Sequence, residues 1–270
     1  MERKHLPSIE IAEPDLSGIT IKSVQEIDTM REAGQVVATT IELLMASIQP
    51  GMKTRELDAI ASREIKRLGA LPAFKGYRGF PATICVSLNQ EIVHGIPGDL
   101  VIRDGDVVSM DVGAIVDGYF SDSAVTVGVG NVTPEAEQLI EATRLSLEKG
   151  IEQATVGKRV GDIGAAVQRY AEAQGYGVVR EYVGHGVGRA LHEEPSIPNY
   201  GDPGKGPLLR AGMVIAIEPM LNLGTWQTRA LDDGWTVETA DGKISAHYEH
   251  TLAITEEGPE VLTARNGSVR

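Results

Sequence analysis

Two aspartates on a predicted β-hairpin have the spacing of a cation site. Asp117-Gly118 separates two apolar runs, and Asp-Gly in that setting predicts a two-residue hairpin loop. The loop pairs Gly113 with Asp122 and places Asp111 two residues along the same face. Two carboxylates on a largely apolar hairpin repel each other unless a proton or a cation lies between them. The hairpin therefore favours metal binding over the alternative of two solvated acids.

Three more residues could join these aspartates in a metal site. Glu218 ends the apolar run Val214–Ile217, and Glu249 interrupts another strand-like stretch, so both differ from ordinary surface acids. His185 stands between glycines in Gly184-His-Gly-Val-Gly188, and these small neighbours would let the backbone approach a crowded centre. Four carboxylates and one imidazole suit two divalent cations that share ligands. Such a ligand set accepts Mn, Fe(II), Co or Zn, so the identity of the metal stays open.

Other chemistries fit these segments less well. The glycine-rich segment around His185 could cradle a phosphate, but no Walker or dinucleotide motif follows it. His192-Glu193-Glu194 is not a His-Glu-x-x-His zinc motif, because Ser196 occupies the last position. A Ser-His-Asp arrangement stays open, although no Gly-x-Ser-x-Gly elbow is present. Cys85 lies in an apolar stretch and is interpreted as a packing residue rather than a nucleophile.

Two similar series of elements would position these residues. The first half predicts a helix from Ser23 to Pro50-Gly51, a second helix that ends at Gly69, and strands from about 83 to 128. The apolar face of the first helix comprises Ile27, Met30, Ala33, Gly34, Val37, Ile41, Leu44, Met45 and Ile48. The second half predicts a helix from Thr133 to about 153, another that ends at Gly175, and strands to about 255.

The two halves align with each other. Gly51 and Gly69 precede Gly157 and Gly175 by 106 residues, and the run 103–111 aligns with 210–218 at an offset of 107. Asp111 then coincides with Glu218. We therefore expect an internally duplicated α+β fold about a pseudo-twofold axis, in which helices cover an antiparallel sheet. We expect an N-terminal extension at 1–22 and a single catalytic domain at 23–270. Within that domain we expect two pseudo-repeats, at about 23–130 and 131–256.

Composition narrows the protein class. The 270 residues, 42% of them hydrophobic, are enough for one large domain, and no apolar run reaches the length of a membrane span. The formal charge of −13 disfavours nucleic acid as a specific partner. No secretory signal is visible, and the single cysteine excludes intramolecular disulfides and cysteine-based zinc sites. We expect a cytoplasmic protein without a membrane partner.

Seven motifs occur together in order along the chain. They are Val93-His-Gly-Ile-Pro97, Ser109-Met-Asp-Val-Gly113, Asp122-Ser-Ala, Gly184-His-Gly-Val-Gly188, His192-Glu-Glu-Pro195, Ile217-Glu-Pro-Met220 and Tyr248-Glu-His-Thr251. With them the sequence resembles the bacterial type I methionine aminopeptidases, in peptidase family M24 of the pita-bread superfamily. The resemblance runs from about Ser23 to Thr263. It implies a pita-bread fold and a metallo-exopeptidase.

The resemblance also implies roles for individual residues. The five ligands of a dinuclear site would be Asp111, Asp122, His185, Glu218 and Glu249. Asp122 and Glu249 would bridge the two ions, which would lower the pKa of a water that attacks the scissile carbonyl. Glu218 would also handle the proton of that water, and His94 and His192 would contact the substrate and stabilise the tetrahedral intermediate. The methionine side chain would enter a slot lined by Tyr77, Phe80, Cys85 and Trp235, with Phe74 and Leu191 nearby.

The implied function is co-translational removal of the N-terminal methionine from nascent polypeptides whose second residue is small and uncharged. The family default is a monomer, and a contact with the ribosome stays open. Two residues depart from the family pattern: Leu191 stands where a Phe is usual, and His247 stands where Gln is usual. The alternatives are an Xaa-Pro peptidase, which normally carries an additional N-terminal domain, and a non-enzymatic binding protein on the same fold.

Overall fold

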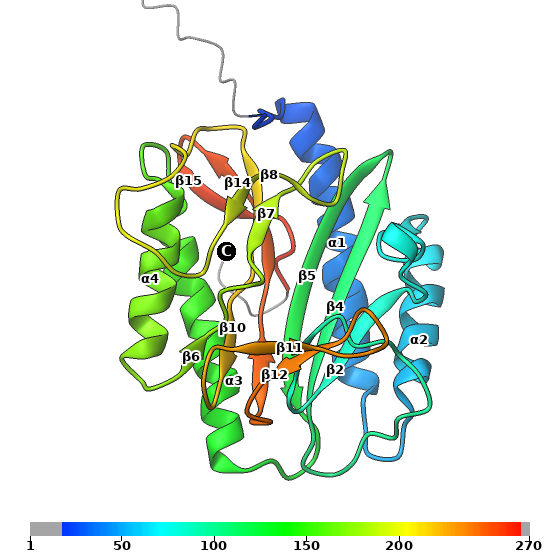
Figure 1. Ribbon diagram of the computed structural model, residues 1–270. Coiled ribbons are helices and arrows are strands. Elements are labelled where there is room, and N and C mark those ends of the chain that lie inside the picture. Colours follow the sequence, from blue (N-terminus) through cyan, green and yellow to red (C-terminus); the bar gives the residue numbers. More distant parts are fainter. Residues whose placement is uncertain (1–17, 266–270) are drawn as a thin grey trace, which may run out of the picture.

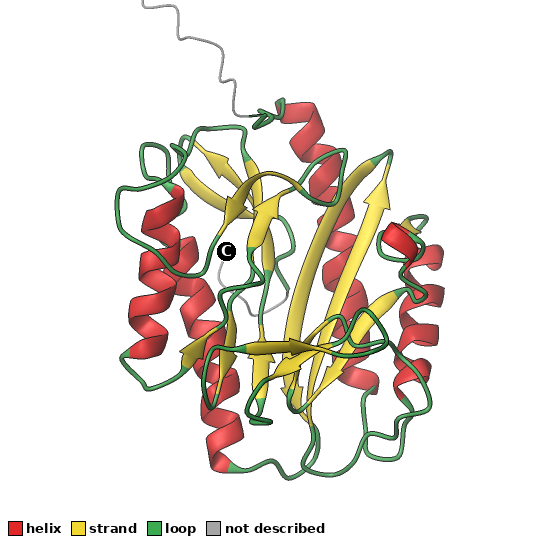
Figure 2. Ribbon diagram, in the orientation of Figure 1, coloured by secondary structure: helices red, strands yellow, loops and turns green. Residues whose placement is uncertain are grey.

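The computed structural model describes residues 18–265, so most of the predicted N-terminal extension lies outside the described residues. Within the described part, four α-helices lie beside a curved layer of strands (Figure 1, Figure 2). They are α1 (Val24–Ser47), α2 (Thr54–Arg67), α3 (Pro134–Ile151) and α4 (Val160–Glu172). None of the helices in residues 18–265 combines the length and apolarity that crossing a membrane requires.

The helices begin where capping chemistry favours them. Ser23 accepts a hydrogen bond from the backbone N–H of Glu26, whose carboxylate accepts one from Ser23 N–H at 2.8 Å, which closes a capping box. The predicted face of α1 is buried except at its C-terminal end, where Ile48, the residue after the helix, is half-buried and Met45 is exposed. Met45 is 42% exposed, so its placement on the buried face was wrong. It lies at the edge of the apolar stripe, where the fully buried Ile41 and Leu44 already fill the contact with the strands.

Every strand pairing in the described residues is antiparallel, which agrees with the predicted α+β class. In the first half, β4 (Val107–Val116) pairs with β1 (Leu71–Pro72), β2 (Ile84–Leu88) and β5 (Tyr119–Gly128). In the second half a five-stranded sheet has the order β15-β14-β9-β7-β8; its strands are Gly258–Val261, His250–Thr255, Val214–Ile217, Gly184–Gly186 and Glu193–Ile197.

Two small sheets complete the strand layer. One has the order β13-β10-β6 (Ser245–His247, Met220–Asn222, Gly177–Val178), and the other has the order β11-β12-β3 (Thr228–Ala230, Val237–Thr239, Glu91–Val93). A single-turn 3-10 helix, η1 (Tyr77–Gly79), lies between β1 and β2. The β11-β12-β3 sheet joins strands from both halves of the chain, and its loops reach toward the first-half sheet (Figure 1).

The predicted hairpin is confirmed residue by residue. Val116 pairs with Tyr119 and Gly113 with Asp122. Both loop residues are left-handed, with φ of 48° at Asp117 and 80° at Gly118, as a type I′ turn requires. The long β4–β5 ribbon therefore presents Asp122 in the predicted register.

Backbone hydrogen bonds repeat between the two halves. The N–H of Gly51 donates to Ile102 O at 2.8 Å, and the N–H of Gly157 donates to Leu209 O at 3.1 Å. Isolated bridges join Lys53 to Val101 and Arg159 to Leu208, at the same offsets of 106 and 107. The first helix pair α1/α2 packs together and so does the second pair α3/α4 (Figure 1). These equivalent contacts are what an internally duplicated fold predicts.

Candidate metal centre

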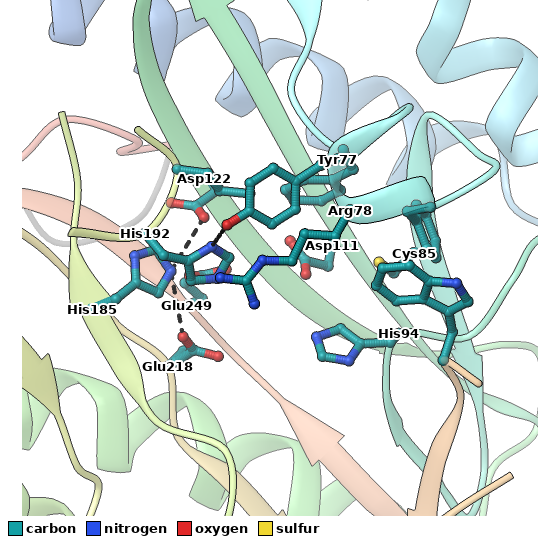
Figure 3. Close-up of a pocket in the computed structure, with 14 residues that line it drawn as sticks. Tyr77, Arg78, Cys85, His94, Asp111, Asp122, His185, His192, Glu218 and Glu249 are labelled. Carbon is teal, nitrogen blue, oxygen red and sulfur yellow. Dashed lines mark hydrogen bonds and ion pairs between the residues drawn. The ribbon is translucent and has the colours of Figure 1, made fainter. Parts of the chain in front are cut away.

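A pocket of about 160 Å³ opens between the first-half sheet and the second-half strands (Figure 3). All five predicted ligands and both predicted catalytic histidines line it, together with the predicted slot residues. The lining residues are Phe74, Tyr77, Arg78, Phe80, Cys85, His94, Asp111, Asp122, His185, Leu191, His192, Glu218, Trp235 and Glu249. The residues singled out in the sequence thus meet at one place, although they are spread over more than 170 positions.

Asp122, His185 and Glu249 form the centre of this pocket. One potential ligand atom from each of them lies within 4.8 Å of those of the other two. His185 Nε2 lies 3.5 Å from Asp122 Oδ2 and 3.6 Å from Glu218 Oε1. His185 Nδ1 lies 3.0 Å from Gly186 O, and donation there leaves the Nε2 lone pair directed at the carboxylates.

Short contacts from neighbouring elements position the carboxylates. Thr251 Oγ1 lies 2.9 Å from Asp122 Oδ1 and accepts a hydrogen bond from Asp122 N–H at 3.1 Å. The N–H of Glu249 donates to Ala124 O at 3.1 Å, so the second-half acid is anchored to the first-half strand β5. Asp111 lies on β4, paired with Ala124, and Glu218 directly follows β9. The site therefore depends on contact between the two halves.

The electrostatics of the pocket are those of crowded buried acids. Burial, followed by the charges of the neighbouring carboxylates, raises the pKa of Asp111, Glu218 and Glu249 well above their usual values. Burial raises the pKa of Asp122 to about 6 and lowers that of His185 to about 4. Asp111 Oδ1 is buried without a hydrogen-bond partner in the described residues. An orphaned carboxylate oxygen beside three other acids and a neutral imidazole fits divalent cations.

The two predicted catalytic histidines flank the acids. Tyr77 Oη lies 2.8 Å from His192 Nδ1, and the two rings stack with centroids 5.4 Å apart. Burial, followed by the charge of His185, lowers the pKa of His192 to about 4. His94 has a left-handed backbone with φ of 61° and contacts the Trp235 ring edge-on, with centroids 6.5 Å apart. Non-glycine residues in this conformation are strained and concentrate at functional sites.

An apolar slot adjoins the acids. Phe80 and Cys85 are buried, and the rings of Phe80 and Trp235 meet edge-on with centroids 5.1 Å apart. Phe74 and Leu191 belong to the same cluster. Burial, followed by the charges of Asp111 and Glu249, raises the pKa of the Cys85 thiol well above its usual value. The thiol is therefore neutral and offers a soft apolar surface.

The structure adds four residues whose contacts were not foreseen from the sequence. Thr251 was only part of a motif; it lies on β14, two residues after Glu249, and its hydroxyl reaches Asp122. Tyr182 contacts His94, with ring centroids 5.7 Å apart. His247 has a buried Nε2 atom that lies 3.8 Å from Glu218 Oε2 and makes no hydrogen bond in the described residues. Arg78 lines the pocket, and no feature of the sequence singled it out.

Comparison with known proteins identifies the protein family of this chain. The family model described as metallopeptidase family M24 matches residues 28–256. The chain therefore belongs to metallopeptidase family M24.

Individual relatives show which members of this family the chain resembles. A methionine aminopeptidase of Clostridium perfringens is 54% identical over 91% of this chain and 98% of its own length, and methionine aminopeptidase 1 of Bacillus subtilis is 54% identical over 91% and 99%. The crystal structure of a methionine aminopeptidase from Thermotoga maritima matches with a TM-score of 0.90 and 46% identity, over 92% of this chain and all of that one. A prolidase from Pyrococcus furiosus matches with a TM-score of 0.75 and 26% identity, over 93% of this chain but 66% of that one. These matches confirm the resemblance to type I methionine aminopeptidases and the pita-bread fold.

Proposed function

We propose that this protein is a metallo-aminopeptidase that removes the N-terminal methionine from nascent polypeptides whose second residue is small and uncharged. One observation carries the proposal: acids from both halves converge on His185 beside a slot of apolar and sulfur-containing side chains. The high identity to methionine aminopeptidases along nearly the whole chain supports the same activity. The prolidase likeness is the main alternative, but its match covers about two thirds of that protein.

The proposed cofactor is a pair of divalent cations held by Asp111, Asp122, His185, Glu218 and Glu249. The family resemblance assigns the shared positions to Asp122 and Glu249, and one potential ligand atom of each lies within 4.8 Å of one of His185. Bound cations of this kind polarise the scissile carbonyl and lower the pKa of an attacking water. Mn, Fe(II), Co and Zn are all compatible with one imidazole and four carboxylates.

The side chains of this chain would carry the remaining steps. Glu218 would accept the proton of the attacking water and pass it to the departing amine. Burial lowers the pKa of His94 and His192 and so keeps both imidazoles neutral. Each can then donate a hydrogen bond from its N–H group to a developing oxyanion. With the Tyr77 hydroxyl as donor to Nδ1, the proton of His192 resides on Nε2. The slot of Phe80, Cys85 and Trp235 would bind the methionine side chain.

The decisive experiment is cleavage of Met-Ala-Ser by chelated, tag-free protein reloaded with one metal at a time. We expect Met-Ala peptides to be cleaved far faster than Met-Lys or Ala-Pro peptides. A preference for Ala-Pro peptides would favour the prolidase alternative. Stoichiometric metal binding without cleavage of any of these peptides would favour a binding protein on the same fold.

The proposed setting is the cytoplasm, where the chain would act as a monomer on N-termini that emerge from the ribosome. The lone buried cysteine, which forms no intramolecular disulfide, supports a reducing compartment. Size-exclusion chromatography with light scattering checks the monomer, and co-sedimentation with ribosomes checks for a ribosome contact.

A further inference from the structure

Arg78 is a pocket residue to which neither the metal centre nor the apolar slot gives a role. It lines the same pocket as Asp111 and His192, and its guanidinium extends across the pocket near His192 (Figure 3). The residue is exposed, so the charge lies at the mouth. Its guanidinium carbon lies 5.3 Å from the centroid of the Tyr77 ring, and no ion pair or hydrogen bond to Arg78 exists within residues 18–265.

The backbone holds this cation in an unusual conformation. Arg78 has φ of 48° and ψ of 23°, between Gly76 with φ of 87° and Gly79 with φ of 91°. Hydrogen bonds from Gly76 N–H to Phe80 O at 2.8 Å and from Phe80 N–H to Tyr77 O at 2.9 Å close the loop. A left-handed conformation costs a non-glycine residue about 1 kcal/mol, so glycine would be the cheaper choice at this position. An observed outlier beside a reactive pocket points to a functional use of the side chain.

The charge balance of the pocket leaves Arg78 uncompensated. Under the proposed function, two divalent cations neutralise the four carboxylates Asp111, Asp122, Glu218 and Glu249. The guanidinium then remains as the unpaired charge at the mouth. A solvent-exposed cation on the wall of a low-dielectric pocket attracts anionic groups and repels cationic ones over several ångströms.

We propose that Arg78 selects substrates by the charge that follows the scissile bond, favouring an acidic third residue and disfavouring a basic one. This inference rests on the proposed function, because it takes the methionine side chain to lie in the slot beside Tyr77. From that slot the substrate must leave through the mouth, at about 3.3–3.6 Å per extended residue. The second residue must be small, so the third residue is the first that can bring a charge to the guanidinium.

The test compares Met-Ala-Asp-Ser, Met-Ala-Ser-Ser and Met-Ala-Lys-Ser amides on the metal-loaded enzyme. For the wild type we expect kcat/KM for the aspartate peptide to exceed that for the lysine peptide about three- to fivefold, the range of an exposed ion pair. The ratio should fall to about 1 in Arg78→Gln, stay above 1 in Arg78→Lys and fall below 1 in Arg78→Glu. Raising the ionic strength should compress the wild-type ratio, since the Debye length is about 10 Å at 0.1 M and about 3 Å at 1 M.

Lys75→Gln is the matched control, because Lys75 is an exposed cation of the same loop that does not line the pocket. It should keep the wild-type ratio. Both rates in each ratio are measured on the same preparation of a variant. A preparation that is only partly folded lowers both rates equally, so it cannot invert the aspartate-to-lysine ratio. A wild type that cleaves the serine peptide with an aspartate-to-lysine ratio near 1, or a ratio that Arg78→Glu leaves unchanged, overturns the inference and leaves the proposed function standing. A wild type that cleaves none of the three with any metal overturns both.

Discussion

At the scale of single residues, the negative charge of Asp122 has opposite effects on folding and on metal binding. Its carboxylate is buried among Asp111, Glu218 and Glu249, which makes its charge costly, yet its closeness to His185 makes that charge useful for binding a cation. Thr251 holds it in place. The same residue should therefore destabilise the metal-free protein and stabilise the loaded one.

Replacing Asp122 with Asn separates the two effects. The pKa of Asp122 is raised from 3.8 to about 6, so its contribution to folding is present below pH 3.8 and is lost as the pH rises through about 6. Metal-free Asp122→Asn should thus be more stable than the metal-free wild type at pH 8, by about 3 kcal/mol, and the difference should vanish near pH 4. With metal, the order should reverse and turnover should be lost. Urea unfolding with and without EDTA measures this.

Asp232→Asn is the control, because it makes the same change at an exposed loop position. It should leave the stability of both forms unchanged within about 0.5 kcal/mol. A metal-free Asp122→Asn protein that is less stable than the wild type at pH 8 would contradict the crowding of charges, and a fully loaded, active variant would contradict a ligand role.

His192 should contribute to catalysis without binding metal. His192→Ala should retain the wild-type metal stoichiometry and lose about 10²- to 10⁴-fold in kcat, the usual contribution of a positioned proton donor. Tyr77→Phe removes only the hydrogen bond at 2.8 Å that orients the ring, so its loss should be about tenfold. Isothermal titration with Mn²⁺ and steady-state kinetics on Met-Ala-Ser provide the measurements. Loss of a bound metal in His192→Ala would instead make His192 a ligand.

At the scale of elements, the segment before α1 supports the loop that carries His192. Lys22 N–H donates to Gly212 O at 2.7 Å, and its buried ammonium lies 2.8 Å from Glu193 Oε2. Glu193 also accepts a hydrogen bond from Ala190 N–H at 3.2 Å. Residues at the end of the predicted extension thus pack onto the catalytic domain and onto the neighbour of a predicted catalytic residue.

Lys22→Met should leave the half-buried Glu193 without its ion-pair partner, although hydrogen bonds from Thr20 and Ala190 remain. We expect a loss of about 1–2 kcal/mol in unfolding free energy, together with a fall in kcat, because the loop of His192 loosens. Burial raises the pKa of Glu193, but its hydrogen bonds to Lys22 and Thr20 more than offset this, and the net pKa is lowered. This stability is present above pH 4.5 and is lost as the pH falls, so the difference between wild type and variant should shrink below pH 4.5.

Adding Glu193→Gln to Lys22→Met should recover part of the lost stability, because the unpaired charge is then removed. Urea unfolding of the two single variants and the double variant completes the cycle. Additive losses in that cycle would show that the two side chains are not coupled.

Elements with local signals could be predicted and those with non-local causes could not. The Asp117-Gly118 turn and the start of the first helix at Ser23 depend on neighbours in sequence, and both are as predicted. The second-half strands were expected as a continuous stretch, but they divide into short pieces in three sheets. Only packing decides which short apolar piece pairs with which partner, as the bond from Glu249 to Ala124 illustrates.

The same distinction applies to the site. Hairpin geometry alone predicts that Asp111 and Asp122 lie close together. The prediction that Glu218 and Glu249 lie beside them depended on the internal duplication and on the family resemblance. The left-handed backbone of Arg78 has no sequence signal, and that of His94 has only a weak one, since histidine is among the residue types enriched at positive φ. Such strained positions are stabilised by surrounding tertiary structure, and a single sequence does not contain that information.

At the scale of the whole molecule, the candidate metal centre links the two halves of the duplicated chain. Asp111 and Asp122 come from the first-half hairpin, and His185, Glu218 and Glu249 come from the second half. Without cations the halves present repelling acids to each other, as the raised pKa values of the carboxyl groups indicate. With cations bound as proposed, the same groups would attract both halves to a shared centre. Neither half can unfold without destroying the site.

Metal binding should therefore stabilise the chain as one cooperative unit. A ligand at 100 times its Kd adds about 2.7 kcal/mol, and for a chain of this size each kcal/mol raises Tm by about 2–4 °C. Saturation of one site should thus raise the Tm of the chelated protein by about 5–10 °C, and of two sites by up to twice that, in a single transition. Differential scanning calorimetry with EDTA and then with Mn²⁺ measures the shift, and Asp122→Asn should show little of it. Two separate transitions, of which the metal moves only one, would mean that the halves fold independently and that the cations belong to one of them.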